Sequence, residues 1–196
     1  MNLDPETTAL IAIHCQGDII GAEGAFADFF HREVVNRDIV EKLWGLLDGA
    51  RSAGATVIYT QIAYRPDYSD LNANSPLLQL ARQRESLKRG AKHTDFIEPL
   101  TPQATDLVVT NQRVGGFTPE LAGILADRGI QTALFAGVAT NISVESSARA
   151  ASDHGYSVAI VEDACSAATR ETHAASIESL GLLASITTSS ELTWQR

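Results

Sequence analysis

The sequence predicts an α/β protein in which a doubly wound, mostly parallel sheet is covered by helices on both faces. Short apolar runs alternate along the chain with longer segments whose apolar residues recur at helical spacing. These runs contain few polar residues, which is typical of strands buried on both faces of a parallel sheet. With 196 residues, 44% of them hydrophobic, the chain is expected to form a single domain over residues 1–196.

Six apolar runs are expected to form the sheet. The first five are rich in Val, Ile, Leu and Ala, whereas the sixth is the weakest. In chain order the expected strands cover residues 8–14, 56–60, 106–110, 132–136, 157–161 and 183–187.

Helical patterns fill the stretches between these strands. Gly54 follows the first long helix as a C-cap, and Gly129 ends a later one. Thr118 and Pro119 indicate an N-cap followed by proline at the first helical position. Helices are expected at about residues 33–53, in a short segment that runs through residue 80, and at 118–128, 141–154 and 170–182.

The stretch from Ala63 to Glu98 is long and irregular for a connection in a compact α/β domain. Insertions of this kind are often binding loops or oligomer contacts. Its basic cluster, from Arg82 to Arg89, also contains glutamate and leucine, so we interpret it as a solvated helix face.

Charge and cysteine content argue against several classes of protein. A net charge of −9 disfavours a nucleic-acid surface, and no apolar run approaches the roughly 20 residues that span a membrane. The first residues lack the pattern of a signal peptide. Cys15 and Cys165 have no metal-ligand spacing and fit free thiols in a reducing compartment. We therefore expect a cytoplasmic protein.

Polar residues follow the expected strands at their carboxyl ends, where open parallel sheets bind ligands. His14 follows the first strand, Tyr64 lies beyond the second, Asn111 follows the third, and Ser143 comes after the fourth. Ser143 also lies near the start of an expected helix, where unpaired N–H groups and the helix dipole favour developing negative charge. This pattern predicts a small-molecule site at that edge of the sheet.

Motifs along the whole chain resemble those of the isochorismatase-like cysteine hydrolases. Residues 9–18 resemble the family's opening strand, A-L-L-V-I-D-x-Q-x-D, and residues 108–117 are similar to V-V-x-K-x-R-x-S-x-F. Residues 137–148 resemble the nucleophile turn, G-V-x-T-x-x-C-V-x-x-T-A. Gly155-Tyr156 and residues 162–167 resemble the G-Y and x-D-A-x-x-A stretch that closes the fold. The resemblance implies a three-layer α/β/α fold and, because members commonly associate, a homo-oligomer of two or more chains.

The resemblance breaks at the three catalytic positions, where the family's aspartate, lysine and cysteine are His14, Asn111 and Ser143. In the family the carboxylate takes the thiol proton, the lysine supports the charge, and the thiolate attacks a carbonyl or nitrile. A hydroxyl needs a better base, and histidine, with a free pKa of about 6.5, is suitable. An amide can orient the imidazole of such a pair. The hypothesis is that Ser143 is the nucleophile, His14 the base within hydrogen-bond reach, and Asn111 an orienter or oxyanion donor.

Simpler interpretations stand beside this one. His14 can be a satisfied, half-buried histidine, Ser143 a small residue in the first turn of a helix, and Asn111 an ordinary turn residue. The leading function is therefore a hydrolase acting on a small-molecule amide, ester or related C–N bond. The alternative is a catalytically inactive homologue that binds a small ligand or serves as an assembly subunit. Isochorismatase-type ether hydrolysis comes third, because the enzymes that perform it keep the aspartate and lysine.

The substrate-binding residues are expected from the same motifs. The resemblance implies a cis peptide bond between Val138 and Ala139, which turns backbone N–H groups toward the substrate. The expected substrate-binding residues are Gln16, Tyr64, Phe117, Val138, Ala139 and Thr140.

No metal or organic cofactor is expected. Metal-binding relatives carry an aspartate and two histidines after the second strand, whereas this stretch has Asp67 and Asp70 but no histidine. Cys15 is expected to be a buried thiol, with a displaced nucleophile as the alternative. The histidines outside the site are expected to be exposed: His31, His93, His154 and His173.

Overall fold

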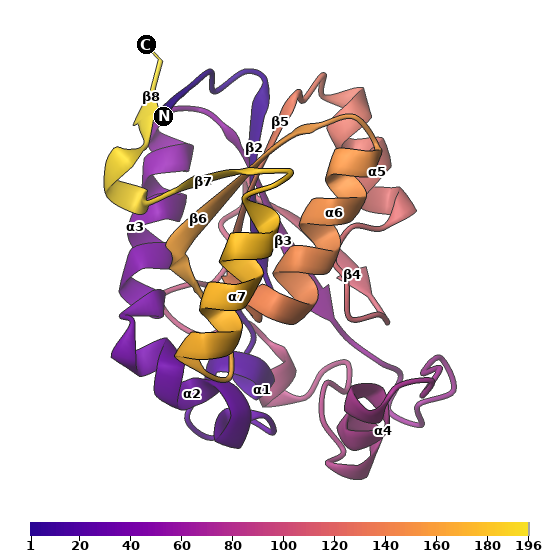
Figure 1. Ribbon diagram of the computed structural model, residues 1–196. Coiled ribbons are helices and arrows are strands. Elements are labelled where there is room, and N and C mark those ends of the chain that lie inside the picture. The colour runs from indigo at the N-terminus through magenta and orange to yellow at the C-terminus, as the bar shows by residue number, and fades with distance from the viewer. Residues whose placement is uncertain (196) are drawn as a thin grey trace.

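All six expected strands are present in one parallel sheet of the computed structural model, which describes residues 1–195 (Figure 1). The last residue of the expected domain, residue 196, lies outside the described residues. Along the sheet the order is β4-β3-β2-β5-β6-β7, and every neighbouring pair is parallel. The strands are β2 (Thr8–Ile13), β3 (Thr56–Ile62), β4 (Leu107–Asn111), β5 (Thr132–Val138), β6 (Ser157–Ser166) and β7 (Ser185–Thr187).

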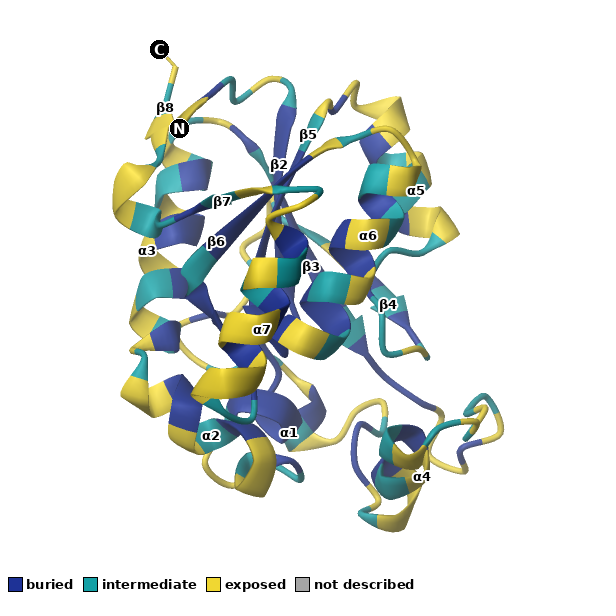
Figure 2. Ribbon diagram, viewed as in Figure 1, coloured by how far each residue is buried: buried dark blue, intermediate teal, exposed yellow. Residues whose placement is uncertain are grey.

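The strand order reverses between β2 and β5. From β2 the chain proceeds to β3 and β4 on one side, then returns to β5 and continues to β6 and β7 on the other. All residues of β2 are buried, as Figure 2 shows for the centre of the sheet. This explains why β2 has an uninterrupted apolar sequence rather than alternation. The reversal creates a crevice at the carboxyl ends of β2 and β5.

Helices cover both faces of the sheet, as Figure 1 shows, with α3 on one face and α5, α6 and α7 on the other. The insertion carries α4, which projects beside the carboxyl edge, the lower edge in that view. The helices are α1 (Gly17–Ile20), α2 (Ala27–Asn36), α3 (Ile39–Ser52), α4 (Pro76–Gln83), α5 (Pro119–Asp127), α6 (Glu145–Asp153) and α7 (Arg170–Leu180). None within residues 1–195 is long and apolar enough to cross a bilayer.

Two short strands join the ends of the described chain and were not predicted. β1 (Asn2–Leu3) pairs in parallel with β8 (Thr193–Trp194) in a separate two-stranded sheet. Two residues are too few to show any periodicity, so the sequence pattern contained no sign of them.

Two details of the predicted helices are wrong. The helix expected at about 33–53 is divided into α2 and α3, because Asp38 between them adopts a left-handed conformation with φ of 54°. The basic cluster is helical only as far as Gln83, where α4 ends. Beyond it Glu85 and Leu87 also have positive φ, so most of the cluster lies on an irregular loop rather than on a helix face.

The closest approach in the sheet involves Gly137 of β5, which is the register partner of Ile13. Its φ is 120°, and a Cβ placed there would lie 2.2 Å from the Ile13 carbonyl oxygen. No side chain fits at this distance, so the contact between β2 and β5 requires glycine.

Gly137→Ala is therefore expected to lower the free energy of unfolding by about 3–5 kcal/mol or to prevent folding, because it adds backbone strain to a steric clash. The matched control is Gly123→Ala on the exposed side of α5, where a Cβ meets nothing within 4 Å. That change is expected to stabilise the protein by about 0.5–1 kcal/mol. Urea denaturation measures both; equal midpoints for Gly137→Ala and the wild type would contradict the argument.

Candidate active site

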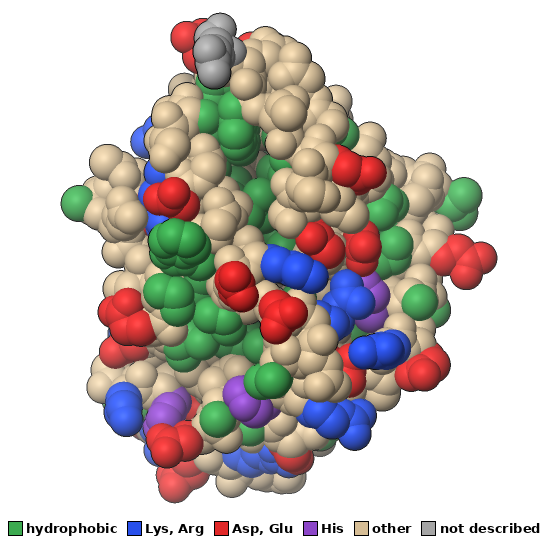
Figure 3. Space-filling view, turned by 90° about the vertical axis from the view of Figure 1, so that its left-hand side faces the viewer, with side chains coloured by type: hydrophobic (Ala, Val, Ile, Leu, Met, Phe, Trp, Pro, Cys, Tyr) green, Lys and Arg blue, Asp and Glu red, His purple; other side chains and the backbone are tan. Residues whose placement is uncertain are grey.

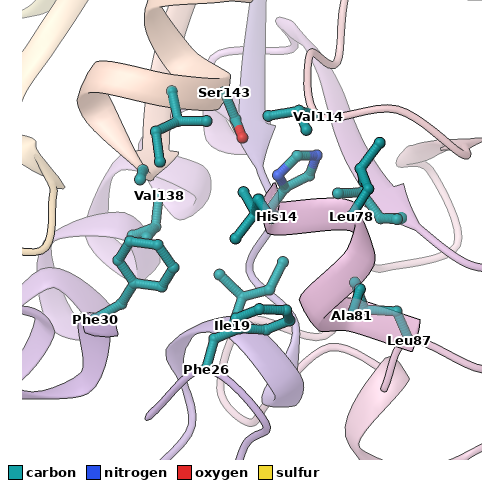
Figure 4. A pocket seen from close by; sticks show the side chains of 14 residues that line it. His14, Ile19, Phe26, Phe30, Leu78, Ala81, Leu87, Val114, Val138 and Ser143 are labelled. Atoms are coloured by element: carbon teal, nitrogen blue, oxygen red, sulfur yellow. The ribbon is translucent and has the colours of Figure 1, made fainter. Parts of the chain in front are cut away.

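A cavity lies at the crevice between the carboxyl ends of β2 and β5, and His14 and Ser143 both line it (Figure 4). His14 follows β2 directly, and Ser143 lies in the turn after β5. The Ser143 oxygen and the His14 ring are on the same side of the cavity, opposite Phe26 and Phe30. Both side chains thus lie at the edge of the sheet where the pattern of strand ends places a small-molecule site.

The turn that carries Ser143 begins at a cis peptide bond between Val138 and Ala139, which confirms the prediction. After it the chain forms a wide turn, the π-helical segment Thr140–Val144. The Ala139 carbonyl accepts hydrogen bonds from the N–H groups of Ser143, at 3.0 Å, and Val144, at 3.1 Å. The turn is anchored to α6 as well, since the Ser147 hydroxyl donates to the Ser143 carbonyl at 2.6 Å.

His14 is buried, with 1% of its surface exposed, and its backbone has a left-handed φ of 52°. The Nε2 atom has no hydrogen-bond partner among the described residues. Burial lowers the pKa of the imidazole to about 3, so the ring is neutral at physiological pH. Within residues 1–195 no hydrogen bond joins the ring to Ser143, so the expected contact is not formed in the site as it stands.

Asn111 is separated from this pair. It ends β4, and β3 lies between β4 and β2, so Asn111 does not lie beside His14 as the hypothesis of an orienting amide requires. Two strand spacings amount to about 9–10 Å, too far for a short amide side chain to span. The Asn111 Oδ1 accepts a hydrogen bond from the Arg113 N–H at 2.8 Å, its Nδ2 is unpaired, and its side chain does not line the cavity.

The expected substrate-binding residues divide into two groups. Val138 and Ala139 line the cavity. Gln16 does not, and instead holds backbone together: its side chain donates to the carbonyls of Ile62 and Thr94, at 2.9 and 2.6 Å, and accepts from the Ile62 N–H.

The two aromatic candidates also lie outside the cavity lining. Tyr64 is fully buried, with its ring centroid 5.9 Å from that of Tyr68. Phe117 packs against His154 and Tyr156, with centroid distances of 4.9 and 6.1 Å. Both rings belong to the packing of the fold around the site.

Thr140 leads to a buried polar network that sequence reasoning missed. Its hydroxyl lies 2.8 Å from Nδ1 of His173, which is buried rather than exposed as expected. Nε2 of the same ring lies 3.0 Å from the Arg37 guanidinium and 3.3 Å from the Glu162 carboxylate. Arg37 also pairs with Glu162 at 3.1 Å. Burial, together with the charge of Arg37, lowers the pKa of His173.

Both cysteines are buried, as expected for Cys15, and neither lines the cavity. Burial raises the pKa of each thiol to about 12. A thiol this well shielded and protonated is a poor nucleophile.

The remainder of the cavity wall is apolar and was not predicted. Its side chains come from α1, from α2 and its N-cap, from α4, from the end of β3, from the loops that carry Leu87 and Val114, and from the turn after β5, all of which are brought together only by the fold. Across residues 1–195 no three His, Cys, Asp or Glu side chains are grouped in a way that could hold a metal ion.

A family model for the isochorismatase domain matches residues 8–191. The chain belongs to the isochorismatase family. One relative in it, the ureidoacrylate amidohydrolase RutB of Caulobacter vibrioides, is 32% identical over 176 residues, covering 83% of this chain and 78% of the relative. The protein of the same name from Rhizobium rhizogenes is 30% identical and covers 84% of this chain and 72% of the relative.

Solved structures of the isochorismatase family share the fold. A cysteine hydrolase from Pseudomonas syringae pv. phaseolicola superposes with a TM-score of 0.85 at 25% identity, covering 96% of this chain and 92% of the other. An isochorismatase family protein from Burkholderia thailandensis gives a TM-score of 0.79 at 28% identity, with coverages of 97% and 95%. The three-layer α/β/α architecture predicted from the sequence is confirmed.

The depressed pKa of His14 predicts a pH-dependent stability. In the unfolded chain the ring takes up a proton near pH 6.5, but in the folded protein only near pH 3, so stability falls as the pH drops through this window. Between pH 7.5 and pH 5 the contribution amounts to about 2 kcal/mol.

His14→Asn should remove this contribution, because asparagine does not titrate and tolerates the left-handed backbone. His154→Asn, which replaces an exposed histidine outside the cavity, is the matched control. Chemical denaturation at pH 7.5 and pH 5 measures the free energy of unfolding at both values. If the His14→Asn protein lost as much stability between them as the wild type, the attribution of this pH dependence to His14 would be contradicted.

Proposed function

We propose that this member of the isochorismatase family hydrolyses a small-molecule amide, or a related C–N or ester bond, with Ser143 as nucleophile and His14 as base. One observation carries the proposal: among the described residues, these are the two polar side chains that line the cavity at the carboxyl ends of β2 and β5. The names of the relatives, ureidoacrylate amidohydrolases, favour an amide over an ether.

In the proposed reaction the Ser143 oxygen attacks the carbonyl carbon while the neutral His14 ring takes its proton. The ring then returns the proton to the leaving amine, and water releases the acyl group from Ser143 by the reverse roles. Ile142 is the first residue of the turn whose N–H donates a hydrogen bond within it, to the Ala139 carbonyl. The N–H groups before it, those of Thr140 and Asn141, are therefore the candidate donors to the oxyanion. Asn111 has a supporting role at most: its side chain accepts a hydrogen bond from the Arg113 N–H and so holds the loop after β4.

A second candidate is an inactive homologue that binds a small ligand. Two observations favour it: the missing hydrogen bond between His14 and Ser143, and the His14 pKa of about 3, which makes the ring a weak base for a hydroxyl. Ether hydrolysis stays third.

The remaining features of the proposal concern context. We infer a single domain, catalysis without metal or organic cofactor, a cytoplasmic location, and assembly into a homo-oligomer. Exposed apolar side chains support association: Figure 3 shows hydrophobic residues gathered on the face of α2 and α3, where Val35 is 57% and Trp44 47% exposed.

Sedimentation at micromolar concentration is expected to give a mass of at least two chains, because association would cover this apolar face. Raising the salt concentration should not dissociate the assembly if apolar burial drives it. A mass of one chain would contradict the inference.

Ser143→Ala is expected to lower turnover by at least about 1,000-fold in a panel of uncharged amides and esters, because it removes the nucleophile. Ser146→Ala is the matched control, since Ser146 is an exposed serine three residues further along the chain that does not line the cavity.

Iodoacetamide should leave the same activity intact, because both thiols are buried and protonated. Loss of activity on alkylation with the fold preserved would transfer the role of nucleophile to a cysteine. Turnover that survives both Ser143→Ala and alkylation would leave His14 acting directly on water, and no turnover of any substrate would favour the ligand-binding homologue.

A further inference from the structure

We propose that the cavity beside Ser143 binds a small, uncharged molecule with an apolar body and one amide-like polar end, and that it discriminates against carboxylates. This inference rests on the proposed function, because it takes the cavity as the substrate site and names the substrate class. Its basis is the composition of the wall, the position of the surrounding charges and the unpaired atom at the polar end.

The wall is apolar apart from one end. Of the 14 residues that line the cavity, all but His14 and Ser143 are apolar, and none carries a formal charge at neutral pH. Figure 4 shows rings and aliphatic side chains, among them Phe26, Phe30 and Leu78, surrounding the space below the polar pair. An ionised carboxylate buried here would lose its hydration without gaining a cation, which is strongly unfavourable.

Two charged side chains that contact lining residues, Arg84 over the Phe26 ring and Asp18 at Leu87, do not supply that cation. Arg84 is held by Asp28 through two hydrogen bonds, at 2.6 and 2.9 Å. Asp18 is buried, and its carboxylate accepts the N–H of Leu87, a lining residue, at 2.7 Å. The side chain fixed behind the wall is therefore acidic and offers a carboxylate ligand no cation.

Arg113 requires separate treatment because it lines a groove that adjoins the cavity. The groove shares Leu78 and Val114 with the cavity and also contains Asp70. Arg113 is exposed to water, so its attraction for an anion is screened. Arg113 is a cation that a carboxylate in the groove can contact, so the test includes it.

The polar end indicates what the ligand must offer. His14 Nε2 is buried and has no partner among residues 1–195, a state that costs free energy until a ligand or water pairs with it. A primary amide supplies both a donor and an acceptor, which can satisfy the imidazole and the Ser143 hydroxyl together. The free volume of about 40 Å³ is room for a few water molecules, so the ligand has few heavy atoms.

Butyramide and succinamate form a matched pair for the test, because succinamate replaces the terminal methyl of butyramide by a carboxylate. Both are titrated into the Ser143→Ala protein, which prevents turnover, and the methyl NMR signals of the Ile, Leu and Val residues that line the cavity are followed. We expect butyramide to shift these signals saturably and succinamate to bind at least about 30-fold more weakly.

A charge introduced at the cavity should reverse the preference. Leu77 on α4 is half-buried and lines the cavity, so Leu77→Arg is expected to tighten succinamate binding by at least about tenfold. Leu80→Arg is the matched control, since Leu80 is half-buried on the same helix but does not line the cavity, and it should leave the ratio unchanged.

Equal or tighter binding of succinamate would overturn the inference. If Arg113→Ala abolished the binding of succinamate, the groove that contains Arg113 would be identified as the site that binds the carboxylate. Failure of both compounds to bind would also overturn it.

The proposed function is tested separately, by turnover in the wild type. Butyramide that binds without being hydrolysed would sink the hydrolase and leave the substrate class standing. Preferential hydrolysis of succinamate would support the hydrolase and overturn the proposed substrate class.

Discussion

The contact between β2 and β5 is the constraint on which the rest of the site depends. These strands are where the sheet changes direction, and at Gly137 their backbones approach too closely for any side chain. Only this approach brings the residue after β2 and the turn after β5 to one cavity. Asn111 ends β4, which is separated from β2 by β3 and from β5 by both β3 and β2, and it stays outside the cavity.

The central strands could be predicted because burial on both faces leaves a local sign in the sequence, an apolar run that is hardly interrupted. Other features depend on partners that are distant in the sequence. His173 occupies an unremarkable helical pattern, and its burial is decided by Arg37, 136 positions earlier, and by Thr140. Asp38 divides two helices although the apolar stripe continues across it, because the break is a backbone conformation and not a change in hydrophobicity.

The candidate site likewise combines features with a local sequence pattern and features that depend on residues distant in the sequence. The positions of His14 and Ser143 and the cis bond were predictable from motif and topology, whereas the environment was not. The apolar wall is assembled from helices, a strand end and loops that are distant in the sequence, and burial behind it keeps the imidazole neutral. Similarly, Gln16 matches a family motif, but its side chain binds the backbone groups of Ile62 and Thr94 and does not line the cavity. A motif therefore identified the position of these side chains better than their role.

The small sheet of β1 and β8 has a consequence for the order in which the chain is connected. Asn2 and Thr193 are register partners, so the two ends of the described chain lie side by side and the backbone nearly closes into a ring. In such a ring the packing of the main sheet does not depend on the position at which the covalent chain is opened. A short peptide joining the ends, with a new break in the exposed loop around Asp67, would preserve every strand neighbour in the main sheet and yield a circular permutant with the same core.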